Sequence, residues 1–211
     1  MVRYERGLWR KGLSRVAGVD EAGRGPLAGP VVAAAVILPL DIFLPGLDDS
    51  KKLSPQKREE IFFKIWREAG AIGVGIVSEI VIDRINILQA TYLAMRQAVT
   101  KLPVSPDCLL VDGMTTIPDL NTFQVAIVKG DSLSISVAAA SIVAKVTRDR
   151  IMVEKDKHFP QYGFAKHKGY GTKVHLKALD KYGACSLHRR SFKPVKERLN
   201  HKVEKIAGEY R

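Results

Sequence analysis

Five short runs of apolar residues, each bounded by glycine, proline or charged residues, predict β-strands. The runs cover residues 15–20, 31–38, 71–78, 109–112 and 123–128. Gly73 and Gly75 lie within the third run, where we expect a neighbouring element to pack closely against the strand.

Three longer segments have the apolar spacing of α-helices, at residues 54–69, 87–101 and 134–157. The first begins with Ser54 as its N-cap and Pro55 at the first helical position. The second presents an apolar face made of Leu88, Tyr92, Met95 and Val99. The third is rich in alanine and isoleucine over its first half, so we expect it to be buried against the sheet.

The order of these elements predicts an α/β layer fold with a central mixed sheet flanked by helices. Three strands come first, and the last two strands precede the long third helix. The segment after Gly183 is expected to form a small helical extension that packs on the sheet. The predicted organisation is a main domain over residues 1–182 and a C-terminal helical extension over residues 183–211.

No stretch of the sequence predicts a membrane span. The longest apolar stretch, residues 31–40, is interrupted by Pro39 and is too short to cross a bilayer. Residues 1–15 carry basic side chains without a following apolar run, which argues against a secretory signal. Cys108 and Cys185 form no CxxC motif or Cys/His cluster, so the sequence predicts free thiols, a cytoplasmic protein and no structural zinc.

The net charge of +12 is concentrated towards the C-terminus. Residues 1–144 hold 16 Lys and Arg and 15 Asp and Glu, a net charge of +1. Residues 145–211 hold 18 Lys and Arg and 7 Asp and Glu, a net charge of +11. A polyanionic partner that contacts the C-terminal third explains this asymmetry, and a solubilising surface is the alternative. A membrane surface is disfavoured because the region lacks a large hydrophobic helix face.

Two adjacent acids, Asp20 and Glu21, end the first strand in an otherwise apolar context. Regular pleating points neighbouring side chains to opposite faces of a sheet. Both acids would therefore reach one site only if the strand breaks at Glu21, which Ala22 and Gly23 permit. The alternative is that Glu21 only begins a solvated loop.

Further acids follow the same logic. Asp112 ends a second apolar run and is followed by Gly113, and ligands of α/β sheets gather at the carboxyl ends of strands. Asp131 follows the last strand and opens the long helix, where helix capping is the alternative role. Asp149 lies within that helix between two arginines, where a surface ion pair is the alternative.

Several carboxylates at strand ends, close to basic segments that attract phosphate, indicate a metal-dependent nuclease. Hard oxygen ligands suit Mg²⁺ or Mn²⁺ and do not suit zinc. Two such ions roughly 3.5–4 Å apart activate a water and stabilise the leaving 3′ oxygen of a phosphodiester. The residues alone leave open whether Asp131 or Asp149 completes the set of acids.

A glycine-rich loop directly follows these acids. Gly23 and Gly25 flank Arg24, so the backbone can approach a ligand closely while the arginine pairs with phosphate. A side chain at either glycine is expected to push a substrate strand away. An ordinary Gly/Pro turn is the alternative.

The remaining candidates are basic or aromatic. Lys51 lies in the loop that precedes the first helix. Tyr170 lies between glycines in the basic third, where it can stack on a base or sugar or pack in the core. Lys173, Lys177 and Lys181 recur at four-residue spacing, so they lie along one side of a helix.

Taken together, these motifs resemble the type 2 ribonuclease H family, ribonuclease HII. The resemblance is carried, in chain order, by residues 19–26, 49–53, 111–113, 130–132, 139–149, 167–172 and 188–192. The motifs extend over nearly the whole chain, and several are long, so chance is a poor explanation.

The resemblance implies a ribonuclease H-like fold, a monomer and an endonuclease. The implied substrates are the RNA strand of RNA–DNA hybrids and duplex DNA with embedded ribonucleotides. The implied products carry 3′-hydroxyl and 5′-phosphate ends, with duplex DNA nicked 5′ of the ribonucleotide. The metal-binding acids of the family, which hold Mg²⁺ or Mn²⁺, fall on Asp20, Glu21, Asp112 and Asp131. Asp131 is therefore favoured over Asp149.

The resemblance also implies roles in substrate binding. The loop that reads the 2′-hydroxyl of the ribose falls on Gly23, Arg24 and Gly25. The lysine near the scissile phosphate falls on Lys51, and the tyrosine that senses the RNA–DNA junction falls on Tyr170.

Three alternatives remain from the residues themselves: another nuclease of the same fold, a catalytically silent nucleic-acid-binding protein, and a basic RNA-associated structural protein. Four acids close to phosphate-binding segments argue against pure binding, because removing negative charge there would strengthen binding. The apolar helix over residues 135–146 argues against a basic structural protein.

Overall fold

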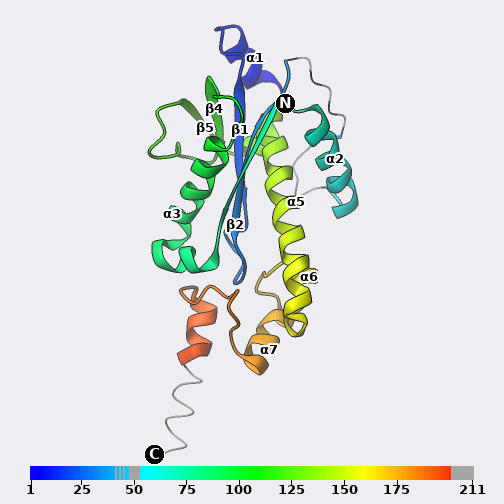
Figure 1. Ribbon diagram of the computed structural model, residues 1–211, viewed down its shortest axis with the longest axis vertical. Coiled ribbons are helices and arrows are strands. Elements are labelled where there is room, and N and C mark those ends of the chain that lie inside the picture. The colour runs from blue at the N-terminus through cyan, green and yellow to red at the C-terminus, as the bar shows by residue number, and fades with distance from the viewer. Residues whose placement is uncertain (41, 43, 45, 48–52, 201–211) are drawn as a thin grey trace, which may run out of the picture.

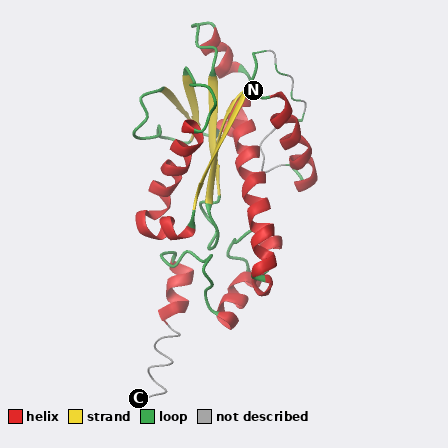
Figure 2. Ribbon diagram, viewed as in Figure 1, coloured by secondary structure: helices red, strands yellow, loops and turns green. Residues whose placement is uncertain are grey.

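The computed structural model describes residues 1–40, 42, 44, 46–47 and 53–200. Within these residues, five strands form one sheet in the order β3-β2-β1-β4-β5 (Figures 1 and 2). The strands are β1 (Val16–Ala22), β2 (Val31–Ile37), β3 (Ala71–Val77), β4 (Cys108–Asp112) and β5 (Phe123–Ile127). β2 is antiparallel to β1 and β3, whereas β4 is parallel to β1 and β5. The predicted mixed sheet is confirmed.

Helices cover both faces of the sheet. They are α1 (Arg3–Trp9), α2 (Pro55–Glu68), α3 (Glu79–Thr100), α4 (Gly130–Leu133), α5 (Ile135–His158), α6 (Phe164–His167) and α7 (Lys173–Tyr182), with a 3-10 turn η1 (Pro160–Tyr162). Residues 193–200 are also helical. α3 packs on β2 and β3 at one face, α5 packs on β1 and β2 at the other, and α2 packs on α5 (Figure 1).

Small residues allow the helices to lie very close to the sheet. A Cβ atom added at Gly73 would lie 2.0 Å from the carbonyl oxygen of Ala98, and one added at Gly75 would lie 1.9 Å from that of Ala94. Both carbonyls belong to α3. The prediction that these two glycines admit a neighbouring element is confirmed, as is the burial of the first half of α5.

The predicted second helix is longer than the sequence indicates. α3 begins at Glu79, and Asn86 divides it with a φ of 66°. The Asn86 side chain accepts hydrogen bonds from amides of the following turn, so the second part begins near residue 87, as predicted. Met95 and Val99 are buried, but Leu88 is 43% exposed, so the predicted apolar face was wrong at its first position.

The long helix lies at Ile135–His158, which confirms the predicted range of 134–157, but the expectation that Asp131 opens this helix was wrong. Asp131 belongs to the short helix α4, and Ser134 is the N-cap of α5, with its hydroxyl accepting a hydrogen bond from the amide of Val137. The buried carboxylate of Glu5 in α1 accepts hydrogen bonds from the Ser134 hydroxyl and from the amide of Ser136. The first turn of α5 is therefore capped from a second element.

Candidate active site

The sheet opens between two of its central strands. β1 pairs with β4 only as far as Val19 and Val111, whereas its pairing with β2 continues to Ala22. Asp20 and Glu21 of β1 lie beyond the last pair, as does Asp112 of β4. The carboxyl ends of the two parallel strands thus bring three predicted acids together.

The expectation that the strand breaks at Glu21 was wrong. β1 runs without interruption through Glu21 to Ala22. Glu21 and Asp112 nevertheless both line two cavities, one against α5 and one against α3. Since β4 no longer pairs with this part of β1, acids from both sides of the pleat reach the opening between the strands.

A cavity of about 220 Å³ lies at this opening. It is lined by Asp20, Glu21, Ala22, Gly23, Asp112, Ser141, Lys145, Arg148 and Tyr170. Three of the four predicted acids, one of the three loop residues and the predicted tyrosine therefore share one cavity. Asp131 is not among its lining residues.

Asp20 is the most strongly perturbed acid of the cavity. Its side chain is 5% exposed, accepts a hydrogen bond from the Glu21 amide at 2.7 Å, and is hydrogen-bonded by the Ser141 hydroxyl. Burial, and then the negative charges of Glu21 and Asp112, raise the pKa of Asp20 well above its usual value. Burial also raises the pKa of Glu21, against the opposing effect of Arg24, whose guanidinium lies 3.3 Å away.

Asp112 and Asp131 are connected through Gly130. The amide of Gly130 donates a hydrogen bond to Asp112 Oδ1 at 2.7 Å. Asp131 follows Gly130 in α4 and is 5% exposed. The first residue of α4 therefore orients Asp112, and the second residue of α4 is Asp131.

The donor set of the cavity fits a hard divalent cation. Asp20, Glu21 and Asp112 offer carboxylate oxygens only, which suit Mg²⁺ or Mn²⁺. Their crowded negative charges repel one another, and a bound cation would relieve that repulsion. Among the described residues, no three or more His, Cys, Asp or Glu side chains already stand in the arrangement of a metal site.

Two buried arginines hold the loop that follows Glu21, and the sequence did not single them out. Arg189 donates hydrogen bonds to the carbonyl oxygens of Gly23, Arg24, Pro26 and Gly29. Arg148 donates to those of Ala28, Pro30 and Lys168. Burial lowers the pKa of Arg189 to about 9 and that of Arg148 to about 10, which leaves both side chains protonated at neutral pH.

This arrangement sets the direction of the loop amides. In a trans peptide unit the carbonyl and the N–H point in opposite directions, and the described residues contain no cis peptide bond. Because the carbonyls of Gly23 and Arg24 face Arg189, the amides of Arg24 and Gly25 point away from it. These two amides are therefore oriented so that they can donate hydrogen bonds to a ligand beside the cavity.

Tyr170 lies on the other side of this loop. Its side chain is 46% exposed, so the alternative of a core tyrosine is wrong. A Cβ atom added at Gly25 would lie 3.7 Å from Tyr170 Cε1, so the ring stands beside the loop. The tyrosine and the loop thus form one surface at the rim of the carboxylate cavity.

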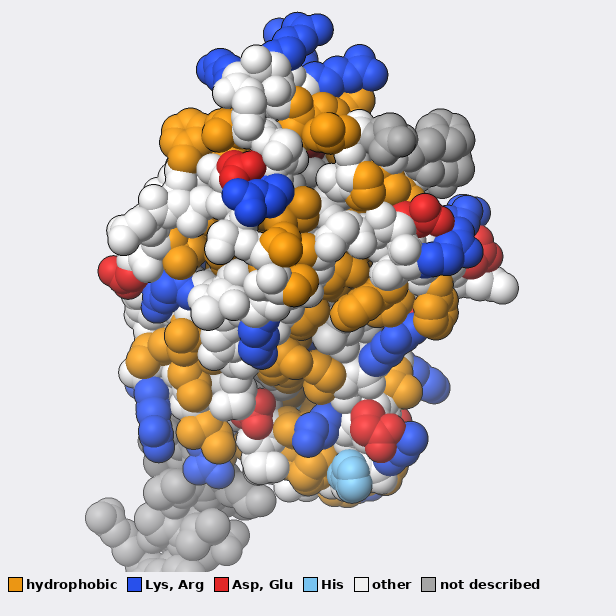
Figure 3. All heavy atoms as spheres, turned by 45° about the horizontal axis from the view of Figure 1, so that its top comes forward, with side chains coloured by type: hydrophobic (Ala, Val, Ile, Leu, Met, Phe, Trp, Pro, Cys, Tyr) orange, Lys and Arg blue, Asp and Glu red, His pale blue; other side chains and the backbone are white. Residues whose placement is uncertain are grey.

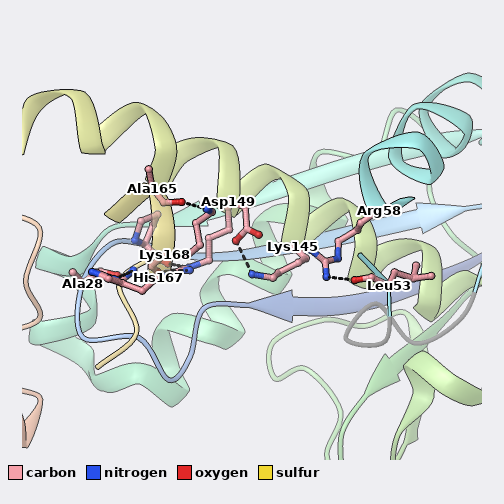
Figure 4. A network of polar contacts seen from close by, with 11 residues as sticks. Ala28, Leu53, Arg58, Lys145, Asp149, Ala165, His167 and Lys168 are labelled. Atoms are coloured by element: carbon pink, nitrogen blue, oxygen red, sulfur yellow. Dashed lines mark hydrogen bonds and ion pairs between the residues drawn. The ribbon is translucent and has the colours of Figure 1, made fainter. Parts of the chain in front are cut away.

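Asp149 lies apart from the three acids. It forms an ion pair with Lys145 at 2.6 Å along α5 (Figure 4), so the alternative of an ion pair is confirmed. The same view shows Arg58 of α2 donating to the carbonyl of Leu53. These side chains line a second groove of about 630 Å³. Lys145 and Tyr170 line both this groove and the carboxylate cavity.

The basic candidates fall in different places. Lys51 lies outside the described residues. Lys173, Lys177 and Lys181 are exposed on α7, as their spacing predicts. Figure 3 shows basic side chains over several parts of one face, including the end where α1 lies. In the part of the chain that is described, no helix has the length and hydropathy needed to span a bilayer.

Cys185 contacts a cluster of three packed histidines, although the sequence contains no zinc-binding motif. Cys185 Sγ lies 3.2 Å from His188 Nδ1, and His188 Nε2 lies 3.1 Å from His175 Nε2. The ring of His167 stacks on that of His175 with 4.5 Å between centroids. The spacing of Cys185 and His188 is the one sequence signal that could have indicated the cluster. Cys108 is a buried free thiol, as predicted, and burial raises its pKa to about 11.

Comparison with known proteins points to one family. The sequence model of a family described as Ribonuclease HII matches residues 17–195. A Ribonuclease HII of Geobacter metallireducens is 61% identical, covering 92% of this chain and 94% of its own, and one of Geobacillus thermodenitrificans is 60% identical, covering 94% and 76%. The crystal structure of the ribonuclease H2 from Pyrococcus horikoshii OT3 superposes with a TM-score of 0.75 at 27% identity, covering 89% of this chain and 98% of its own.

Proposed function

The chain belongs to the ribonuclease HII family, and from this premise we propose that Asp20, Glu21, Asp112 and Asp131 form its active site. The protein is a ribonuclease H, a divalent-metal-dependent endonuclease that hydrolyses the RNA strand of RNA–DNA hybrids. The observation that carries the site is the cavity at the opening between β1 and β4, where three of these carboxylates meet.

These acids would hold the metal, with Mg²⁺ or Mn²⁺ as the ion. When bound, such ions activate a water and stabilise the leaving 3′ oxygen of the phosphodiester. Asp20 is positioned by the Glu21 amide and the Ser141 hydroxyl, and Asp112 is positioned by the Gly130 amide. Asp131, which α4 carries directly after Gly130, would complete the set of acids. The products carry 3′-hydroxyl and 5′-phosphate ends.

The loop of Gly23, Arg24 and Gly25 distinguishes RNA from DNA. Only the 2′-hydroxyl differs between the two sugars at a given position. The amides of Arg24 and Gly25, which point away from Arg189, are oriented to donate to that hydroxyl. A site that hydrogen-bonds a hydroxyl rejects a substrate without it far better than an apolar pocket rejects a methylene. Arg24, half-exposed, pairs with phosphate.

Tyr170 senses the junction between ribonucleotide and deoxyribonucleotide. Its exposed ring stands beside Gly25, so a sugar that follows the recognised ribose would contact the ring. A deoxyribose packs on this ring more closely than a ribose because it lacks the 2′-hydroxyl. The enzyme therefore nicks duplex DNA 5′ of a single embedded ribonucleotide.

The rest of the chain supports duplex binding. Lys51 lies near the scissile phosphate, and the exposed lysines of α7 contact the duplex at a distance from the cavity. Residues 1–182 form the catalytic domain, the described part of the C-terminal extension (residues 183–200) packs on it, and the enzyme acts as a monomer.

Cleavage of three duplexes, with Mg²⁺ and with Mn²⁺, tests this function. We expect cuts in a uniform RNA–DNA hybrid and 5′ of a single ribonucleotide in DNA, and none in an all-DNA duplex of the same sequence. Cleavage of the all-DNA duplex would indicate a general nuclease of the same fold. Binding without cleavage in either metal would indicate a silent nucleic-acid-binding protein.

A further inference from the structure

Three imidazoles pack together next to the segment that carries Tyr170. His175 and His188 are fully buried, and their Nε2 atoms lie 3.1 Å apart. The ring of His167 stacks on that of His175 with an angle of 15° between the planes. None of the three lines the carboxylate cavity. Their effect on the reaction must therefore pass through other residues.

One backbone amide determines where the protons of two rings lie. The amide of Cys185 donates to His188 Nδ1 at 3.0 Å, so this nitrogen is an acceptor. A neutral imidazole carries one N–H, which must then be on Nε2 of His188. That N–H donates to His175 Nε2, and the proton of His175 is consequently on Nδ1. His175 Nδ1 lies 2.9 Å from the carbonyl oxygen of Tyr170 and donates to it.

Both rings are in the state that this chain of hydrogen bonds requires. Burial lowers the pKa of His188 to about 4 and also lowers that of His175. Both are therefore neutral at neutral pH. A proton added to Nε2 of His175 would place two N–H groups against each other between the Nε2 atoms. A proton added to Nδ1 of His188 would face the amide N–H of Cys185.

This chain of hydrogen bonds ends at Tyr170, whose ring lines the carboxylate cavity. The backbone of Tyr170 is fixed on both sides, since its amide donates to the carbonyl of His167 and its carbonyl also accepts from the amide of Thr172. The carbonyl of the preceding Gly169 accepts from the amide of Leu27. These contacts fix the backbone from which the Tyr170 ring extends, and in this structure the ring stands beside Gly25.

We propose that His188 and His175 are positioning residues, which fix Tyr170 beside Gly25 and so set the preference of the enzyme for a ribonucleotide followed by DNA. Arg189, which follows His188 in the sequence, holds the glycine loop on which the Tyr170 ring borders. It donates hydrogen bonds to the carbonyls of Gly23 and Arg24. The inference rests on the proposed role of Tyr170.

Matched substitutions separate hydrogen bonding from packing. The amide of asparagine lies where Nδ1 of histidine lies, and the amide of glutamine reaches the place of Nε2. His175→Asn therefore keeps a donor for the Tyr170 carbonyl, whereas His175→Gln removes it. His188→Gln keeps a donor for His175, whereas His188→Asn removes it. If the rings served only to fill space, glutamine would be the better replacement at both positions, because it is larger than asparagine.

The readout is the ratio of kcat/KM on a duplex with one ribonucleotide to kcat/KM on a uniform hybrid. We expect His175→Gln and His188→Asn to lower this ratio about tenfold, the effect of removing one hydrogen bond, and to approach the value of Tyr170→Ala. His175→Asn and His188→Gln should stay within about twofold of wild type. Equal ratios for Asn and Gln at both positions, or better retention by Gln at both, would overturn the inference.

Two further measurements distinguish a failure of the proposed role of Tyr170 from a failure of the role of the two histidines. If Tyr170→Ala leaves the ratio unchanged, the proposed role of Tyr170 fails, and the inferred effect on selectivity fails with it. The ¹H–¹⁵N spectrum of the wild-type imidazoles tests the chain of hydrogen bonds without any variant. It should show the proton on Nε2 of His188 and on Nδ1 of His175, and the reverse assignment at either ring would contradict the relay.

Discussion

Gly23 and Gly25 flank the same arginine but stand in different surroundings. Gly23 has a φ of +100°, and a Cβ atom there would lie 2.1 Å from Arg148 Nε and 2.8 Å from the carbonyl oxygen of Pro30. A Cβ atom at Gly25 would meet only Tyr170 Cε1, at 3.7 Å. The expectation that a side chain at either glycine pushes the substrate away therefore applies to Gly25. At Gly23 the side chain would collide with the protein first.

Substitutions at the two glycines should have different consequences. Gly23→Ala should lower the free energy of unfolding by about 2 kcal/mol, because it combines positive φ with a collision at Arg148. Gly25→Ala should change it by less than about 0.5 kcal/mol and yet lower kcat/KM on every ribonucleotide substrate at least about tenfold. Urea unfolding and cleavage assays check both. Wild-type activity of Gly25→Ala would show that the substrate does not approach this backbone.

Single residues were predictable from sequence where their signal is local. Asp20, Glu21 and Asp112 could be found because each acid ends an apolar run. Arg148 and Arg189 could not be found in this way, because they bind carbonyls that are distant in the sequence. Arg148 is 118 residues from Pro30, and Arg189 is 166 residues from Gly23. A buried arginine bound only by backbone carbonyls leaves no partner side chain for a sequence pattern to reveal.

At the level of elements, the sequence predicted the strands and the long helices better than the short ones. The five strands agree with the predicted runs to within about two residues, because strand ends coincide with glycine and charged residues. The helix α1 was missed. It has seven residues and includes Gly7, so local propensity does not indicate it. Its place depends on Glu5, which reaches the N-terminus of α5.

Removal of the Glu5 charge should loosen this contact. The carboxylate lies at the positive end of the α5 dipole and accepts from Ser134 and Ser136. Glu5→Gln should lower the free energy of unfolding by about 1–2 kcal/mol, and the substitution places no new atom in the site. Urea titration measures the change. An unchanged midpoint with an unchanged slope would mean that α1 contributes nothing to the capping of α5.

The lysines of α7 make a prediction about long-range binding. Replacing Lys173, Lys177 and Lys181 by Gln should weaken binding to all duplexes about equally. It should also reduce the slope of log affinity against log salt by roughly 0.9 for each phosphate that α7 no longer neutralises. The matched control replaces Arg3, Arg6 and Arg10 by Gln, because α1 lies at the opposite end of the molecule (Figure 1). Equal slopes for the two triple variants would mean that α7 is only solvated.

At the level of the whole molecule, the C-terminal segment packs against the loop that follows β1. The amide of Gly29 donates to the carbonyl of Leu187, and the amide of Arg189 donates to the carbonyl of Leu27. These contacts join segments about 160 residues apart in the chain. The sequence predicted that the segment after Gly183 packs on the sheet domain, but the burial of His188 and Arg189 depends on tertiary structure and has no local signature.

The burial of His188 in this segment makes the stability of the folded protein depend on pH. His188 faces the Cys185 thiol, the His175 ring and the rings of Tyr162 and Phe164. Its pKa is about 4 in the folded protein and about 6.5 in the unfolded chain, so the unfolded chain binds more protons between these values. Stability from this group is therefore complete above pH 6.5 and falls by on the order of 3 kcal/mol as the pH drops towards 4.

Urea unfolding between pH 4 and pH 8 measures this dependence. His175 contributes in the same direction, because burial lowers its pKa as well. The control is His188→Gln, which keeps a neutral donor and should flatten the acid side of the profile. A wild-type profile that does not change between pH 7 and pH 4.5 would contradict the buried neutral state of His188.

The central claim is that the carboxylates at the opening between β1 and β4 carry the hydrolysis. Asp112 tests it most directly, since its carboxylate lies at the end of β4 and its position is set by the Gly130 amide. Asp112→Asn keeps the shape and the acceptor for that amide but removes the charge that a divalent ion needs. The measurement is single-turnover cleavage of a uniform RNA–DNA hybrid by wild type and Asp112→Asn at saturating enzyme. We predict near-normal hybrid affinity with a loss of cleavage of at least about a thousandfold, which corresponds to about 4 kcal/mol in the barrier. Cleavage by Asp112→Asn within about tenfold of wild type would place the active site elsewhere.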